Sequence, residues 1–215
     1  TFRIGGIHPK ENKFSAGKAI ESIAIPSEVV VPLSQHIGAP CQPVVKRGDM
    51  VKVGTLLGKS VGFVSANIHS PVSGKVKKID SALDASGYKR NAIIIDVEGD
   101  EWEESIDRTD TLVRECNLSP KEIIEKIAAA GIVGMGGATF PTHVKLTPPP
   151  GTKAEVLIIN GVECEPYLTA DHTLMMAKTE EILVGTQLLM KTVNVNRAVI
   201  GIENNKPDAI ARFRE

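Results

Sequence analysis

A glycine-rich segment that begins at Gly134 is the strongest candidate for ligand binding in this sequence. It continues through Gly136 and Gly137 to Phe140, and Lys145 follows. Glycines let backbone N–H groups converge on an anion and let a flat ligand lie against the main chain, while a lysine neutralises a phosphate as a point charge. The segment is neither a dinucleotide-binding fingerprint, because a helix is expected before it, nor a Walker A loop. Taken alone, it could also be a tight helix–helix turn.

A second candidate follows the hydrophobic residues 156–159, which read as a buried strand. The polar residues Asn160, Glu163 and Glu165 come directly after it. Open α/β sheets bind ligands at the carboxyl ends of their strands, so these side chains are expected to face a ligand. The alternative is a polar loop whose acids are solvated or cap the next helix. Cys164 stands between two carboxylates, which disfavours a reactive thiolate, and it is predicted to pack or to line the ligand site.

Two halves of different rhythm must position these residues. From residue 29 to about 97, short β-rich runs alternate with turn residues, which is typical of a small all-β domain. A helix is then predicted from the cap Ser119 to Gly131, a second over residues 174–190, and a further strand over residues 197–202. Strands alternating with helices indicate a parallel or mixed sheet. A last helix is expected from Pro207 to the end of the chain, which suggests a longer protein.

Composition excludes several classes of function. The 215 residues carry 25 Lys and Arg against 26 Asp and Glu, so no general nucleic-acid surface is expected. No apolar run approaches the roughly 20 residues that span a bilayer. Three widely spaced cysteines form neither a disulfide framework nor a metal site, so we expect no bound metal and a reducing compartment.

The β half resembles the flattened barrel of biotinyl and lipoyl domains. The resemblance rests on the turn Gly48-Asp49 and on Pro71-Val72-Ser73-Gly74. Phe63 stands where such carriers hold their modified lysine, so a docking barrel is favoured over a covalent carrier. His69 is predicted to be a packed or surface residue.

Both ligand motifs together resemble the FMN- and NADH-binding subunit of respiratory complex I. The opening Gly5-Gly6-Ile7-His8-Pro9-Lys10-Glu11-Asn12-Lys13, the stretch 32–40 and the lysine-less barrel look closer to the C subunit of the Rnf-type ion-translocating ferredoxin:NAD oxidoreductase. The resemblance covers essentially the whole chain. It departs from the family in lacking a cysteine cluster for two four-iron clusters, which are expected only in a following region, and in having Thr139 where the complex I relatives carry glycine.

The resemblance implies an α+β chain with a barrel-sandwich domain at 1–98, a linker at 99–118 and an α/β FMN/NADH-binding domain at 119–215. Its implied cofactor is FMN, with NADH as substrate and no catalytic side chain. The implied FMN contacts are Gly134, Gly136, Gly137, Phe140, Lys145, Asn160, Glu163 and Glu165. The acidic residue near nicotinamide is Glu203, or Asn205 if the alignment slips by two; Glu203 could instead be a helix N-terminal acid before Pro207.

The implied partners are the other subunits of a membrane ion-translocating redox complex, reached from the cytoplasmic face without a membrane span. Two alternatives stay open: a non-catalytic docking adaptor, and a thiol enzyme that uses Cys164 and His172. The second is disfavoured because the acidic neighbours of Cys164 do not activate a thiolate.

Overall fold

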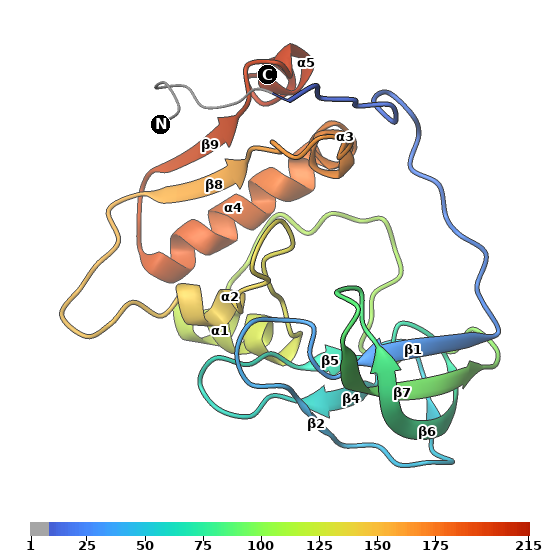
Figure 1. The fold of residues 1–215 in the computed structure, drawn as a ribbon. Coiled ribbons are helices and arrows are strands. Elements are labelled where there is room, and N and C mark those ends of the chain that lie inside the picture. The colour runs from blue at the N-terminus through green and yellow to red at the C-terminus, as the bar shows by residue number, and fades with distance from the viewer. Residues whose placement is uncertain (1–8) are drawn as a thin grey trace, which may run out of the picture. The chain divides into compact units, whose positions relative to one another are not determined.

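The computed structural model describes residues 9–215, so residues 5–8 of the opening motif lie outside the described residues (Figure 1). The chain divides into two compact units. The barrel unit comprises Ala24–Lys153, and the α/β unit joins Thr1–Ile23 to Ala154–Glu215. The predicted division at 99–118 stays a prediction.

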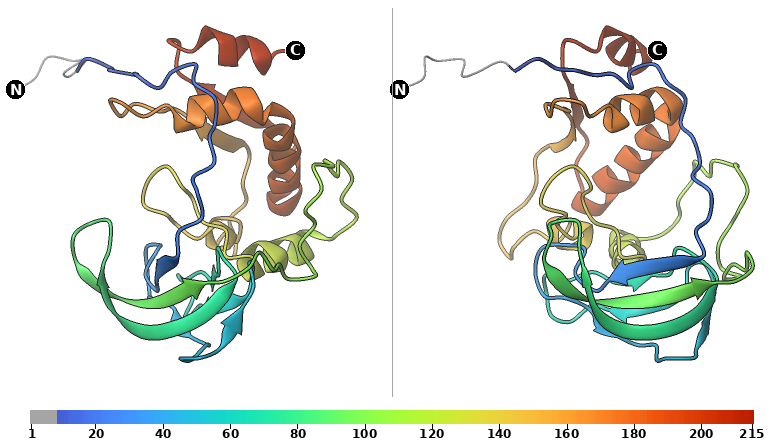
Figure 2. Two further views of the ribbon diagram at one scale, coloured as in Figure 1. Left: turned by 90° about the vertical axis from the view of Figure 1, so that its right-hand side faces the viewer. Right: turned by 45° about the vertical axis from the view of Figure 1, so that its right-hand side comes forward.

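The barrel unit contains two antiparallel sheets, as the β-rich rhythm predicted. One has the strand order β1-β7-β6-β3 and the other β2-β4-β5. Figure 2 shows β6 and β7 curling together as one long hairpin. The strands are β1 (Glu28–Pro32), β2 (Gln42–Pro43), β3 (Met50–Val51), β4 (Leu56–Lys59), β5 (Ile68–His69), β6 (Gly74–Leu83) and β7 (Lys89–Val97).

The core of the barrel is small and aliphatic. Leu57, Val76, Ile93 and Ile95 are fully buried, and burial of such side chains contributes about 1.5–3 kcal/mol each. Phe63, by contrast, is 70% exposed in the loop between β4 and β5. That is the position at which a carrier domain would hold its lysine, and an apolar side chain occupies it.

The acidic segment that follows β7 begins against the barrel. The amide of Val53 donates to the Glu101 carbonyl at 2.9 Å, the amide of Glu103 donates to the Val53 carbonyl at 3.0 Å, and the Thr55 hydroxyl donates to the Glu103 carboxylate at 2.5 Å. Residues 107–119 form no helix or strand. The first residues of the predicted linker are therefore bonded to the barrel.

Helix α1 (Pro120–Ala129) begins at the predicted cap. Ser119 and Glu122 form a capping box, with Pro120 at the first helical position. The chain turns at Gly131, whose φ is +69°. A Cβ there would lie 2.1 Å from the Asn67 carbonyl oxygen, so only glycine fits. The short helix α2 (Thr142–Lys145) completes this unit.

The α/β unit contains the parallel pair that was predicted. Strand β8 (Leu157–Gly161) pairs with β9 (Ala198–Ile202), with Leu157 opposite Ala198. The helices are α3 (Ala170–Ala177), α4 (Thr179–Val193) and α5 (Pro207–Arg212). Within the described residues, no helix is long and apolar enough to cross a membrane.

The single helix predicted over residues 174–190 is wrong. The structure has two helices, which meet at Lys178, where φ is −130° and ψ is 34°. The apolar pattern continues across this break, so periodicity alone did not reveal it. The last helix starts at Pro207 as predicted, but it ends at Arg212 instead of running to Glu215.

Candidate functional site

The glycine-rich loop (residues 134–140) has a fixed neck and an open tip. The amide of Gly134 donates to the Phe140 carbonyl at 3.0 Å, and the amide of Thr142 donates to the Ile132 carbonyl at 3.0 Å. Between these bonds the chain projects outward, and Met135 is 91% exposed. Among residues 9–215, no backbone carbonyl accepts a hydrogen bond from the tip amides, which are those of Met135, Gly136, Gly137 and Ala138.

Three of the predicted residues meet at the neck of this loop. The Nζ of Lys145 lies 5.8 Å from the centre of the Phe140 ring, and it is also near Gly134, 4.0 Å from where a Cβ on that residue would be. Lys145 is exposed at the end of α2. Burial lowers the pKa of His143 in the same helix, which favours the neutral form of its imidazole.

The backbone conformation of the loop does not by itself explain its glycines. None of Gly134, Gly136 and Gly137 has a positive φ; the left-handed residue of the loop is Thr139, at +50°. A Cβ on Gly137 would meet no atom within 4 Å. The structure does not itself require glycine at position 137 for backbone strain or for space, which leaves the approach of an external group as a reason for it.

The acidic loop (residues 160–169) is centred on a buried carboxylate. Glu163 is 3% exposed, and its Oε1 accepts a hydrogen bond from the amide of Asp171 at 2.8 Å. It therefore caps α3, whose N-cap residue Thr169 makes no side-chain capping bond. The helix-capping alternative thus holds for one oxygen of Glu163. The other oxygen, Oε2, is buried and has no partner among the described residues.

The remaining predicted residues of this loop are exposed. Asn160 Oδ1 accepts from the amide of Val162 at 3.1 Å, which shapes the start of the loop. Glu165 is exposed. Cys164 is exposed as well, so the expectation that it packs is wrong, whereas the alternative that it lines the ligand site stays a prediction.

Glu203 joins this cluster through a lysine that the sequence analysis missed. Lys206 is 4% exposed; its Nζ pairs with Glu203 and lies 3.5 Å from the Glu163 carbonyl oxygen. Glu203 Oε2 also accepts from the Glu163 amide at 3.4 Å. The hydrogen bond from Lys206 holds the pKa of Glu203 below its ordinary value, whereas burial and the nearby Glu163 raise the pKa of Asp171.

A second missed lysine comes from the N-terminal segment. The Nζ of Lys13 donates to the carbonyl oxygens of Glu163, Glu165 and Leu168 at 3.0, 2.9 and 2.7 Å. Lys13 is 150 positions from Glu163, so no local pattern signals the contact. The sequence clue is that Lys13 is the last residue of the opening motif that begins at Gly5.

The thiol alternative finds no support in the geometry. His172 Nε2 lies 3.0 Å from both carboxylate oxygens of Asp208. Within residues 9–215, no group of three or more His, Cys, Asp or Glu side chains is placed to hold a metal ion.

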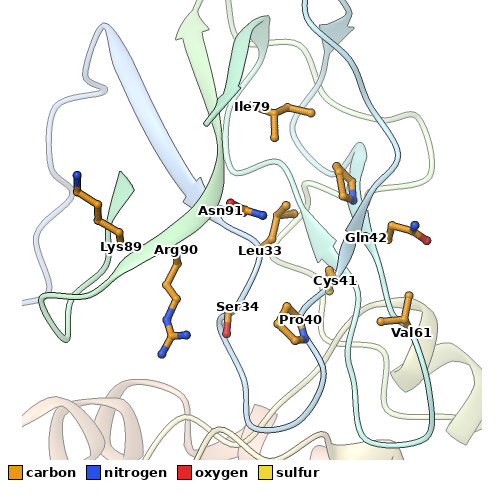
Figure 3. A pocket seen from close by; sticks show the side chains of 11 residues that line it. Leu33, Ser34, Pro40, Cys41, Gln42, Val61, Ile79, Lys89, Arg90 and Asn91 are labelled. Atoms are coloured by element: carbon orange, nitrogen blue, oxygen red, sulfur yellow. The ribbon is translucent and has the colours of Figure 1, made fainter. Parts of the chain in front are cut away.

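A cavity lies elsewhere in the barrel unit. It has a volume of about 560 Å³, and none of the predicted ligand-binding residues lines it. Figure 3 shows Lys89 and Arg90 on one side of this pocket and Gln42 and Val61 on the other. A second cavity, of about 370 Å³, is lined by Met135 and Thr139 of the glycine-rich loop together with Asn67 and His69.

The two loops suit a flavin nucleotide by their donors and acceptors. The open amides and the exposed ammonium of Lys145 match a phosphate. The unpartnered oxygen of Glu163 can accept from a hydroxyl or a ring N–H. Each loop thus has unused hydrogen-bonding capacity of the kind that the group would need.

Each half of the chain matches a known protein family. Residues 1–100 match the family described as RnfC Barrel sandwich hybrid domain, and residues 127–215 match the Nuo51 FMN-binding domain. The chain is thus a barrel-sandwich domain followed by an FMN-binding domain, which confirms the predicted fold class. The C subunit of the proton-translocating ferredoxin:NAD(+) oxidoreductase complex of Clostridium ljungdahlii is 50% identical over 213 residues, 98% of this chain and 46% of the relative.

Two further relatives are also C subunits of ion-translocating oxidoreductase complexes. The C subunit of the Na(+)-translocating ferredoxin:NAD(+) oxidoreductase complex of Acetobacterium woodii is 45% identical over 98% of this chain and 47% of its own length. The C subunit of the ion-translocating oxidoreductase complex of Rhodobacter capsulatus is 45% identical over 96% of this chain and 40% of its own length. These matches agree with the resemblance found in the sequence, and the chain spans about half the length of the curated relatives it matches.

Proposed function

We propose that this chain binds FMN and passes electrons between NAD(H) and FMN, and onward to iron–sulfur centres, within a membrane-associated ferredoxin:NAD oxidoreductase complex. The observation that carries the proposal is the match of residues 127–215, which include both candidate loops, to an FMN-binding domain. Bound FMN accepts two electrons as hydride and releases them singly. The chain itself needs no nucleophile, only groups that bind and orient.

Each loop has its own part in the proposal. The backbone of Gly134, Gly136 and Gly137 approaches the flavin nucleotide, with Phe140 beside it, and Lys145 neutralises the phosphate. This assignment is supported by the exposed tip amides and by the open space at Gly137.

The acidic residues contact the rest of the ligand. Asn160, Glu163 and Glu165 are assigned to the ribityl chain or the ring edge, which the free oxygen of Glu163 supports. For the nicotinamide side, Glu203 is favoured over Asn205, because Glu203 belongs to the Glu163 cluster whereas the amide of Asn205 donates to Glu11 at 2.9 Å.

The wider role follows from the relatives. Their names place the C subunits in ion-translocating oxidoreductase complexes. We therefore assign this chain other subunits of such a complex as partners, NAD(H) as substrate and a peripheral place at the cytoplasmic face of the membrane, with four-iron clusters outside residues 1–215.

Flavin titrations test the assignment. Lys145→Ala removes one charge-assisted contact worth about 1.5–3 kcal/mol, so FMN affinity should fall by about one to two decades. Riboflavin, which has no phosphate, should bind weakly and equally to both proteins. The control is Lys153→Ala, an exposed lysine of the same unit, which should change neither titration.

The outcomes separate the alternatives. Equal weakening of FMN and riboflavin by Lys145→Ala would show that the lysine does not read the phosphate. A colourless protein that no flavin titrates would leave the docking adaptor as the function.

A further inference from the structure

A strap from the N-terminal segment (residues 11–15) lies along the acidic loop inside the α/β unit. The Glu11 carbonyl accepts from the amide of Tyr167 at 2.9 Å. The hydroxyls of Ser15 and Thr169 are 2.7 Å apart. Strap and loop are thus joined at both ends by hydrogen bonds.

Lys13 stands between these two ends and uses its full donor capacity. An ammonium group has three N–H donors and no acceptor. Its three partners are the carbonyls of Glu163, Glu165 and Leu168, at 3.0 Å or less. A single charged group therefore fixes the direction of three peptide units, including those of both glutamates assigned to the ligand.

The backbone on both sides of this contact is strained. Asn12 and Tyr167 have φ values of 49° and 74°, in the left-handed region that residues other than glycine rarely adopt. Such residues persist only where their surroundings over-determine them. Here the surroundings include the edge-on contact of Phe14 with Tyr167, at 5.7 Å between ring centres.

The strap also reaches the loop that carries Glu203. Asn205 Nδ2 donates to Glu11 Oε1 at 2.9 Å. One short segment therefore holds the loops that follow β8 and β9, where ligand contacts are assigned. The acidic loop has few bonds of its own, chiefly Asn160 to Val162 and Glu163 to Asp171.

We propose that Lys13 is a positioning residue of the flavin site, which sets the acidic loop so that Glu163 and Glu165 face the ligand. The proposal rests on the proposed function. Lys13 acts through the loop carbonyls and does not itself touch the ligand, so its loss should loosen the loop before any ligand is added.

Two measurements on the same variants test this. In Lys13→Met, amide hydrogen exchange of residues 163–169 without ligand should speed up at least tenfold, and FMN should bind about tenfold more weakly. Lys13→Arg should fall between wild type and Lys13→Met, because it keeps the charge and donors in a different shape. The control Lys10→Met alters an exposed lysine just outside the strap and should change neither quantity.

A chemical rescue separates the ammonium from the fold. Lys13→Ala lacks a propylammonium group, so added propylammonium should restore slow exchange and FMN affinity. Tetramethylammonium at the same concentration has no N–H donor and should not. Equal effects of the two salts would overturn the assignment.

The remaining outcomes are distinguishable. Unchanged exchange in Lys13→Met overturns the proposal, and faster exchange with unchanged FMN affinity overturns the positioning role. Absence of FMN binding by the wild-type chain defeats the proposed function, and the exchange rates then decide whether Lys13 fixes the loop.

Discussion

The acidic loop and the glycine-rich loop are built in opposite ways. The first is held by two lysines from distant parts of the chain, Lys13 and Lys206, which bind its backbone and its neighbouring carboxylate. The second is closed only at its neck, and its tip amides have no backbone partner among the described residues. The acidic loop is therefore organised without a ligand, whereas the amides of the glycine-rich tip remain open for the ligand that we propose.

This difference has an energetic meaning. A preorganised group loses little entropy on binding, while a mobile loop must be ordered at a cost. Donors at the open tip offset that cost when they meet an anion, because charge-assisted hydrogen bonds are stronger than neutral ones. Affinity should be limited by the glycine-rich loop and orientation by the acidic one.

The largest effect is expected at Lys206, the buried lysine that contacts the acidic loop. Lys206→Met would leave the carboxylate of Glu203 without its ammonium partner, which should cost about 3 kcal/mol or more. Chemical denaturation of the α/β unit measures the loss. The control Lys178→Met removes an exposed pair with Glu181 and should cost less than about 1 kcal/mol. Equal losses would show that burial of Lys206 does not matter.

The second-largest effect is expected at Gly137, where a substitution should weaken FMN binding without changing stability. Gly137→Val fills space that is empty without ligand, so stability should hold while FMN affinity falls at least tenfold, about 1.4 kcal/mol. Gly161→Val is the contrast, since a Cβ there would lie 3.0 Å from the Gly201 carbonyl and 3.1 Å from Met175 Sδ. Gly161→Val should lower the free energy of unfolding of the α/β unit by about 1–3 kcal/mol. Unchanged FMN binding by Gly137→Val would remove the tip from the site.

Part of the fold and of the candidate site could be predicted from the sequence, and part could not. The cap at Ser119 and the parallel strands follow local rules of spacing and capping, so they were predictable. The contacts of Lys13 and of Lys206 with the Glu163 carbonyl were not predictable, because they join residues that are 150 and 43 positions apart. The approach of a ligand to the three glycines stays a prediction, and the left-handed residue of their loop is Thr139.

The pH response of the acidic loop contains two opposed contributions. The pKa of Glu203 is lowered, so its stabilisation is complete above the ordinary range of glutamate, about pH 5, and is lost as the pH falls. The pKa of Asp171 is raised, so the folded state favours its protonated form and is penalised as the pH rises. Glu203→Gln should therefore flatten the loss of stability in acid, and Asp171→Asn should steepen it. Denaturation midpoints of both variants at several pH values check the two signs.

The smallest effect concerns the strained residue of the open loop. Thr139→Gly relieves a left-handed conformation that costs a β-branched residue about 1 kcal/mol, but it also makes the unfolded chain more flexible. We expect a gain in stability of at most about 1 kcal/mol. A loss in thermal denaturation would mean that the Thr139 hydroxyl, which donates to the Ala138 carbonyl at 2.7 Å, outweighs the strain.

The joint between the barrel and α1 has a mechanical consequence. Asn67 Nδ2 donates to the Ala129 carbonyl at 3.1 Å, and the close approach of Gly131 to the Asn67 carbonyl leaves no room for any side chain. In a carrier domain the β4–β5 loop would hold the modified lysine. Here this loop is held against α1, the helix that leads into the glycine-rich loop. The barrel therefore supports the helix that precedes the glycine-rich loop, so a displacement of the β4–β5 loop would also displace that helix.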